Sequence, residues 1–443
     1  MKTVRAVLLA GAVALAGGLA AHAAGFLTNG LPVAGGSQFP STLPLTGNET
    51  IPLDTNLPSG QSPQSEAATT NQIAGFVRSL GGMNDWKNFL IGGDATTNLW
   101  QRGTTGSSVT TTATYGGPDR WAYWSGTNTA MTVSQTSTAN DLPASGYQYG
   151  FKMARTAGQT GVVQMCMAQV IESNLSYSMA GRTVELDFHA TAGATYSPTN
   201  SLLQVYIVYG TGADEGLAKM AFGLNAGGGG ASAWTDQTSA LAGSVAISTT
   251  NTRYVAAASI PATATEVGVA ICMTPTGTAG ANDYVSLSGI QLARNPTLSG
   301  IAGTVVSATN QQASSFAYRA QAVETVLQQR YYYQLTETAA ITPIAPCASV
   351  SITVTNCYVT FPVTMRAAPT VTYTTGFATP TSTTQATLGA CSALVTATTV
   401  TSAVANAGGV LVNCTATTIP AAGTASFLYS NNGSGAIKAS AEL

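Results

Sequence analysis

Short strand-like segments that follow one another without helical crossovers constrain this chain more than any other feature. The clearest is residues 182–192, where apolar side chains alternate with Glu185, Asp187 and His189. A period of two places successive side chains on opposite faces of a strand. About nine such segments lie between residues 86 and 298, at the intervals typical of a sandwich. Because no helix separates them, we expect antiparallel sheets and predict an all-β, jelly-roll β-sandwich.

The residues before this region predict an exported chain. Residues 1–23 combine Lys2 and Arg5 with an apolar run and an A-x-A site, which is typical of a cleaved secretory signal peptide. An uncleaved membrane anchor is the alternative. Residues 24–85 are rich in turn formers and are interpreted as an extended attachment or assembly segment, with a plain linker as the alternative. Within them, residues 66–80 show the spacing of a short helix.

The stretch from Ser286 to Leu335 joins two β-rich halves. We assign residues 299–335 to a linker and short helix, because Val323, Val326 and Leu327 fall at helical spacing. Tyr331–Tyr333 then favour a strand. Residues 336–443 are interpreted as a smaller C-terminal β domain. Its flat, Thr-rich strands would aggregate if left exposed, which favours a homo-oligomer such as a trimer.

Charge excludes some partners. Only 8% of the residues are charged and the net charge is −2, with no basic patch, so a nucleic-acid partner is not expected. After signal cleavage no segment is long and apolar enough to span a membrane. We therefore expect a secreted or cell-surface protein, with a virion-associated one as the alternative.

Six cysteines behind an export signal permit disulfides. Two of them, Cys166 and Cys272, lie in apolar strand-like runs and are either buried thiols or a bridge between neighbouring strands. The other four lie near the C-terminal end, and we expect them to pair among themselves, as Cys347–Cys357 and Cys391–Cys414. No C-x-x-C spacing supports a zinc or redox site.

Aromatic residues supply the candidate binding site. Trp124 and Trp234, with Tyr123, are predicted to stack on a sugar ring while amide and acid side chains bind its hydroxyls. Core packing is the alternative for each of them. Arg102 and Asp119 are interpreted as a structural ion pair, or as a contact to an acidic sugar.

Catalytic candidates are few. His189 shares a strand face with Asp187 and Glu185, which could form an acid/base cluster or simply be the solvated or oligomer-facing side of a strand. Neither G-x-S-x-G, H-E-x-x-H nor a P-loop is present. We therefore do not expect an enzyme.

Several motifs in order carry a family resemblance: NFLIGGD at 88–94, WQRG at 100–103, DRW at 119–121, QVIE at 169–172, GIQLARNP at 289–296, FAYR at 316–319, ETVLQQRYYYQ at 324–334 and FPVTMRAAPTV at 361–371. Together the motifs resemble bacteriophage tail-fibre and related structural proteins with a carbohydrate-binding-module-like jelly roll. The export signal departs from that pattern. The resemblance implies that Asp94 and Asp283, beside the first and last strands, could share a structural calcium, and no other cofactor is expected.

These observations predict a non-enzymatic, fibre-like structural and recognition protein that binds cell-surface or extracellular glycan through its jelly roll. One alternative is a purely structural exported envelope or filament subunit. A second is a polysaccharide-degrading enzyme, because sequence alone does not exclude two carboxylates placed across a substrate.

Overall fold

The computed structural model describes residues 50–54, 65–69, 88–95, 100–104, 107–109, 112–125, 131–143, 146–225, 230, 232–308, 313–336, 342–351, 354–373, 377–380, 388–390, 406–415, 422–423, 425–430 and 436–443. The chain divides into two compact units, Met1–Asp85 and Trp86–Leu443. In the first unit, β1 (Thr50–Asp54) pairs antiparallel with β2 (Ser65–Thr69). Residues 66–69, expected to begin a helix, are therefore in a strand; residues 70–80 and the signal peptide lie outside the described residues.

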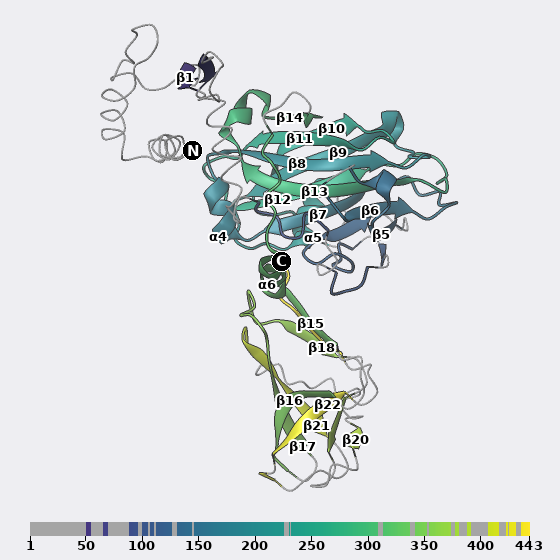
Figure 1. The fold of residues 1–443 in the computed structure, drawn as a ribbon. Helices are drawn as coiled ribbons and strands as arrows, with labels where there is room; N and C mark the ends of the chain where they lie inside the picture. The colour runs from purple at the N-terminus through teal and green to yellow at the C-terminus, as the bar shows by residue number, and fades with distance from the viewer. Residues whose placement is uncertain are drawn as a thin grey trace, which may run out of the picture. The chain divides into compact units, whose positions relative to one another are not determined.

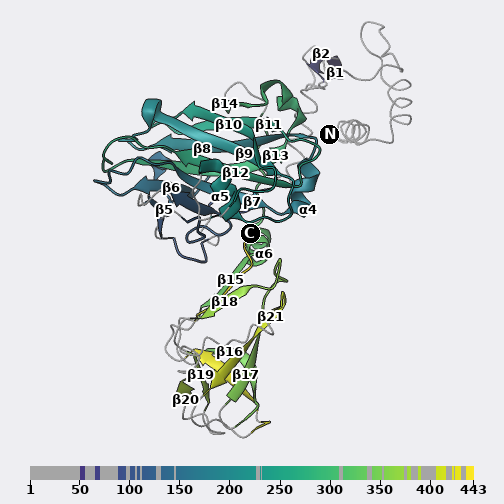
Figure 2. The same ribbon diagram turned by 180° about the vertical axis from the view of Figure 1, so that it is seen from behind.

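The described strands of the second unit include a sandwich of a five-stranded and a seven-stranded sheet, each antiparallel (Figures 1 and 2). The five-stranded sheet has the order β10 (Thr238–Ala246), β9 (Leu202–Gly210), β12 (Glu266–Met273), β7 (Met165–Ile171) and β4 (Ala122–Ser125). The order in the seven-stranded sheet is β14 (Thr304–Ser307), β11 (Thr252–Ser259), β8 (Thr183–Ala192), β13 (Tyr284–Arg294), β6 (Gly150–Arg155), β5 (Met131–Thr136) and β3 (Ser107–Val109). This confirms the predicted all-β jelly-roll sandwich.

Alternation builds the core between the two sheets. On β8, Val184, Leu186 and Phe188 enter the main apolar cluster, together with side chains of β9 and β12. The opposite side chains of β8, Glu185 and Asp187, are also buried. The interpretation of that face as solvated or oligomer-facing is therefore wrong, because residues 313–320 of the same chain cover it.

Two local assignments differ from the structure. The apolar run KNFLIGGD at 87–94, which local sequence favours as a strand with a glycine turn, is turns and bends over its described residues, 88–94. The Asn88 side chain accepts from the backbone amides of Leu90 and Leu292 and holds this segment against β13. Gly93 lies so close to Ile290 that a Cβ would be 1.8 Å from its carbonyl oxygen. Side-chain and backbone contacts to β13 thus replace a sheet ladder here.

The segment after β13 also differs from a free linker. β14 pairs with β11 at the edge of the seven-stranded sheet, so part of residues 299–335 belongs to the sandwich. The expected short helix is present as α6 (Gln321–Gln329), and the tyrosine run continues into β15 (Tyr332–Thr336). Among the described helices, none is long and apolar enough to cross a membrane.

Two smaller sheets follow. One has the order β15, β23 (Ala436–Ser440) and β18 (Thr370–Tyr373). The second has the order β20 (Leu388–Ala390), β19 (Phe377–Pro380), β22 (Ala425–Ser430), β16 (Thr342–Ser349), β17 (Val354–Thr360) and β21 (Gly409–Thr415). A disulfide joins Cys347 on β16 to Cys357 on β17, which are in register. The considered Cys391–Cys414 pair lies outside the described residues, because Cys391 does.

Candidate functional site

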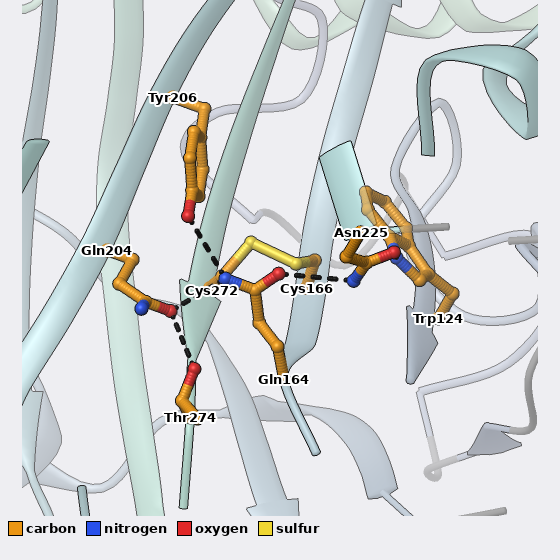
Figure 3. Close-up of a disulfide and its surroundings, with 8 residues drawn as sticks. All are labelled: Trp124, Gln164, Cys166, Gln204, Tyr206, Asn225, Cys272 and Thr274. Carbon is orange, nitrogen blue, oxygen red and sulfur yellow. Dashed lines mark hydrogen bonds between the residues drawn. A yellow bond between two sulfur atoms is a disulfide. The ribbon is translucent and has the colours of Figure 1, made fainter. Parts of the chain in front are cut away.

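The outer face of the five-stranded sheet carries a row of four side chains in register. Trp124 on β4 lies opposite Cys166 on β7, which lies opposite Cys272 on β12, which lies opposite Gln204 on β9. Neighbouring strands place such residues on the same face. Cys166 and Cys272 are joined by a disulfide (Figure 3), so the bridge between strands, one of the two alternatives for this pair, is the one present.

A chain of neutral hydrogen-bonding groups surrounds this row (Figure 3). Gln164 donates from Nε2 to Oε1 of Gln204 at 2.7 Å and to the hydroxyl of Tyr206 at 3.1 Å. Asn225 donates to Gln164 at 3.1 Å, and the Thr274 hydroxyl donates to Gln204 at 2.8 Å. We call Gln164, Gln204, Tyr206, Asn225 and Thr274 the amide cluster. All five are half-buried, so each combines a fixed position with access to solvent.

The edge of the sheet leaves the amide cluster open on one side. On β10, Ala242 lies opposite Tyr206 and Ser244 opposite Gln204, and both of these small residues are exposed. Among the described residues, the amide nitrogen of Gln204 makes no hydrogen bond. The cluster can therefore offer donors and acceptors, beside a tyrosine ring, to a neutral polar ligand.

The helix α5 (Leu217–Asn225) explains why the predicted aromatic site is wrong. It packs on the same outer face of the sheet (Figure 2). There its Leu217, Met220 and Ala221 share an apolar cluster with Trp124 and Trp234. The Trp234 indole donates to the carbonyl of Gly216 at 3.1 Å, just before the helix. Trp124 is 0% and Trp234 is 2% exposed, so neither ring is available to stack on a sugar.

Trp124 nevertheless adjoins the amide cluster. Its indole nitrogen donates to Asn225 at 3.1 Å, at the end of α5, and so fixes one end of the hydrogen-bond chain. Tyr123, the third predicted stacking residue, points the other way into the sandwich core and is fully buried. Trp124 therefore holds Asn225 of the amide cluster in place, whereas Tyr123 lies in the core and does not contact the cluster.

The two carboxylates proposed for calcium belong to different contacts. Asp283 is fully buried and accepts from Arg155 at 2.7 Å, and from the backbone amide and hydroxyl of Ser197. Asp94 lies in the turn after residues 88–93. Among the described residues, no group of three or more His, Cys, Asp or Glu side chains could hold a metal ion. The oxygens of Asp283 already accept from Arg155 and Ser197, and the guanidinium of Arg155 supplies the positive charge beside them. This carboxylate therefore does not fit a calcium site.

The charged residues of the WQRG and DRW motifs form a buried network. Arg102 pairs with Asp119 at 2.9 Å, as the structural interpretation expected, and also with Glu442 at 3.2 Å. Arg120 pairs with Glu442 at 2.5 Å and lies 3.6 Å from the centre of the Tyr331 ring. Burial raises the pKa of Asp119 to about 7, although Arg102 opposes this. Because the charges of Arg102 and Arg120 are paired inside the fold with Asp119 and Glu442, this network is structural.

The face that carries Glu185, Asp187 and His189 is covered by residues 313–320, which we call the strap. Glu185 accepts from the backbone amide of Ser314, and Asp187 pairs with Arg253, which also donates to the Ser314 carbonyl. Burial raises the pKa of both carboxyl groups. Glu185 therefore holds the strap, and Asp187 holds Arg253.

Glu266 offers a test of pH dependence. It is buried at the start of β12, where Oε1 accepts from the amide of Glu215 at 2.5 Å. Burial raises its pKa to about 7, above the value of about 4.3 in an unfolded chain. Stability present at low pH is therefore lost as pH rises through 7. Between pH 5 and pH 9 the wild-type protein is therefore expected to lose free energy of unfolding on the order of 2 kcal/mol through this group. Glu266→Gln should remove that part of the loss, as measured by thermal denaturation at the two pH values.

The control for this titration is Asp236→Asn, which changes an exposed carboxylate in a nearby loop. Asp236→Asn should keep the wild-type difference between the two pH values. If Glu266→Gln also kept it, the buried carboxyl would not be the titrating group.

Sequence reasoning missed the amide cluster and α5. The signal for two of its members was present, because alternation in SLLQVYIVYG places Gln204 and Tyr206 on one strand face. Nothing local connects them to Gln164, Thr274 or Asn225, which come from other segments. The cluster exists only because β7, β9 and β12 are neighbours.

No protein-family model and no curated protein matches this chain. Among solved structures, a family 4 carbohydrate-binding module is 14% identical over 38% of this chain and 87% of its own, with a TM-score of 0.23. A family 61 carbohydrate-binding module solved with β-1,4-galactotriose is 10% identical over 47% and 99% of the two chains, with a TM-score of 0.26. The enzymatically active domain of tailspike protein 4 from bacteriophage CBA120 is 11% identical over 48% of this chain and 22% of its own, with a TM-score of 0.28. These likenesses concern the fold alone.

Proposed function

We propose that the β-sandwich binds a neutral carbohydrate at the amide cluster on the outer face of its five-stranded sheet. The observation that carries this proposal is the connected set of amide and hydroxyl groups beside the half-buried ring of Tyr206. Sugar hydroxyls donate and accept hydrogen bonds, as carboxamides do, and the C–H face of a pyranose packs on an aromatic ring. The open β10 side gives a polymer room to extend.

We propose that this site binds without catalysing hydrolysis. Hydrolysis of a glycoside requires two carboxyl groups on either side of the bond. The side chains that form the amide cluster are neutral, and the acids described on the opposite sheet are held by the strap and by Arg253. Loss of viscosity of a polysaccharide on incubation with the protein would contradict a purely binding role.

The wider role that we propose is that of an exported, fibre-like recognition protein that assembles with copies of itself. Support comes from the ordered phage-fibre-like motifs and from the low charge of the chain. Tyr358 and Phe427, on the six-stranded sheet, are 38% and 49% exposed, which also favours the alternative of a purely structural subunit that self-associates. The mass of the purified protein in solution would report its oligomeric state.

The binding test compares two tyrosine variants. Tyr206→Ala removes both the ring and the hydroxyl that accepts from Gln164, and is expected to weaken binding at this site at least about tenfold. Binding would be measured by calorimetry against xylo-, gluco- and galacto-oligosaccharides. Tyr177→Ala is the matched control. Tyr177 is 74% exposed and lies outside the amide cluster, so this variant should bind the oligosaccharides as tightly as wild type does. Unchanged binding in Tyr206→Ala would contradict the proposed site.

A further inference from the structure

On the seven-stranded sheet, a bulge at Gly289 of β13 lets the ring of Tyr147 pack directly on the strand. The register of β13 against β8 shifts between Ser288 and Gln291, and Gly289 within that shift has a φ of +57°. A Cβ at Gly289 would lie 2.3 Å from Cζ of Tyr147. Only glycine allows both the backbone conformation and the close approach of the ring. The Tyr147 ring therefore lies directly against the strand.

Three more rings gather around Tyr147. Tyr147 lies 5.4 Å from His189 and 5.4 Å edge-on from Phe316, and Phe316 lies 4.8 Å edge-on from Tyr318, measured between ring centres. Tyr318 is 50% exposed, while the others are half-buried. We call Tyr147, Phe316 and Tyr318 the aromatic cluster. It presents an apolar surface to solvent on the seven-stranded sheet.

The strap holds this surface in place. Gln291 uses both ends of its amide on the strap: it accepts from Ala317 N at 2.7 Å and donates to Ser315 O at 3.2 Å. The Tyr318 hydroxyl donates to the carbonyl of Gly146. A ring fixed in this way loses little conformational entropy when a ligand packs on it.

Polar groups border the aromatic cluster. His189 Nδ1 lies 3.0 Å from Asn251 Oδ1, and Arg253, whose side chain is 33% exposed, reaches the strap at Ser314. Gln148, next to Tyr147, is exposed. These amide and guanidinium groups can bind hydroxyls at the rim of a stacked ring.

We infer that the aromatic cluster is a second carbohydrate-binding surface, on which a pyranose stacks against Tyr318. It lies on the sheet opposite the amide cluster and goes beyond the proposed function, because it uses other residues and does not depend on the first site. With a site on each sheet, one chain can hold two glycan strands at once. Linking two weak sites in this way raises the overall affinity for a polymer.

The test measures stoichiometry by calorimetry on the full chain, with the same xylo-, gluco- and galacto-oligosaccharides. Wild type is expected to bind two ligands per chain, and Tyr318→Ala one. Tyr318→Phe keeps the ring and should keep both sites, which separates stacking from the hydroxyl contact to Gly146. Phe316→Leu, which removes the edge-on support but retains an apolar group, should weaken the second site at least about tenfold. Circular dichroism would check that each variant is folded.

The outcomes distinguish the two sites. If Tyr318→Ala and Phe316→Leu both bind as wild type does, the second surface is overturned and the cluster only anchors the strap. If Tyr206→Ala binds as wild type but Tyr318→Ala loses binding, the amide cluster is overturned and the second surface stands. If no oligosaccharide binds the wild-type chain, both are overturned.

Discussion

Replacing Cys166 and Cys272 together by alanine is expected to lower the free energy of unfolding of the β-sandwich by roughly 3–5 kcal/mol. The disulfide closes a loop with a sequence separation of 106, so its loss frees a large part of the unfolded chain. Both sulfurs are fully buried, so alanine also leaves less packing under α5. Urea denaturation followed by tryptophan fluorescence would measure the change, because Trp124 and Trp234 pack in the same cluster.

The matched control is Cys347→Ala with Cys357→Ala. This disulfide spans a separation of only 10 and lies in the C-terminal six-stranded sheet. Its loss should leave the unfolding of the sandwich unchanged. A loss below about 1 kcal/mol for the Cys166 and Cys272 variant would show that the sheet contacts alone hold β7 and β12 together, since the loop-closure model requires several times that value.

Replacing Asp283 by asparagine is expected to destabilise the sandwich by roughly 3–5 kcal/mol, because it leaves Arg155 as a buried charge without its partner. Both side chains are 0% exposed, and the N–O distance is 2.7 Å. Arg155 also donates to the carbonyls of Gln159, Gly161 and Gly277, so the pair ties two loops to β6 and β13. Chemical denaturation at pH 7 would measure the loss.

Two comparisons sharpen this experiment. Asp236→Asn, an exposed carboxylate, should change stability by no more than about 0.5 kcal/mol. Wild-type protein should unfold at the same denaturant concentration with and without EDTA, because Arg155 takes the place that a calcium ion would have at Asp283. A lower denaturation midpoint in the presence of EDTA would show that a bound metal ion stabilises the protein, and would contradict this assignment of Asp283.

Some of the fold followed from local patterns. The alternation in residues 182–192 correctly put Val184, Leu186 and Phe188 on one strand face, which packs in the core, and the helical spacing near Val323 correctly gave α6. The same patterns failed at residues 87–94, where the described residues, 88–94, do not form the expected strand. There an apolar run packs through side chains and glycine instead of a ladder, and β propensity cannot distinguish these cases.

The candidate sites show the limit of sequence most clearly. Trp124 and Trp234 were selected because their residue type suits sugar stacking, yet α5 covers both. Tyr206 and Tyr318 have the same chemistry and remain accessible. Composition gave the kind of residue that a carbohydrate surface needs, but not the ones that reach solvent.

By itself the sequence determined the all-β class, the order of the strands along the chain and the helix before the tyrosine run. These depend on periodicity over a few neighbouring residues, which the backbone geometry of strands and helices imposes. Only the tertiary structure decided which faces are open. α5 covers part of the five-stranded sheet and leaves the amide cluster accessible. The strap covers part of the seven-stranded sheet and itself contributes Phe316 and Tyr318 to the aromatic cluster. Burial depends on segments that are far apart in the chain, as Gln164 and Gln204 or Tyr147 and Tyr318 are, and no local pattern records which of them meet.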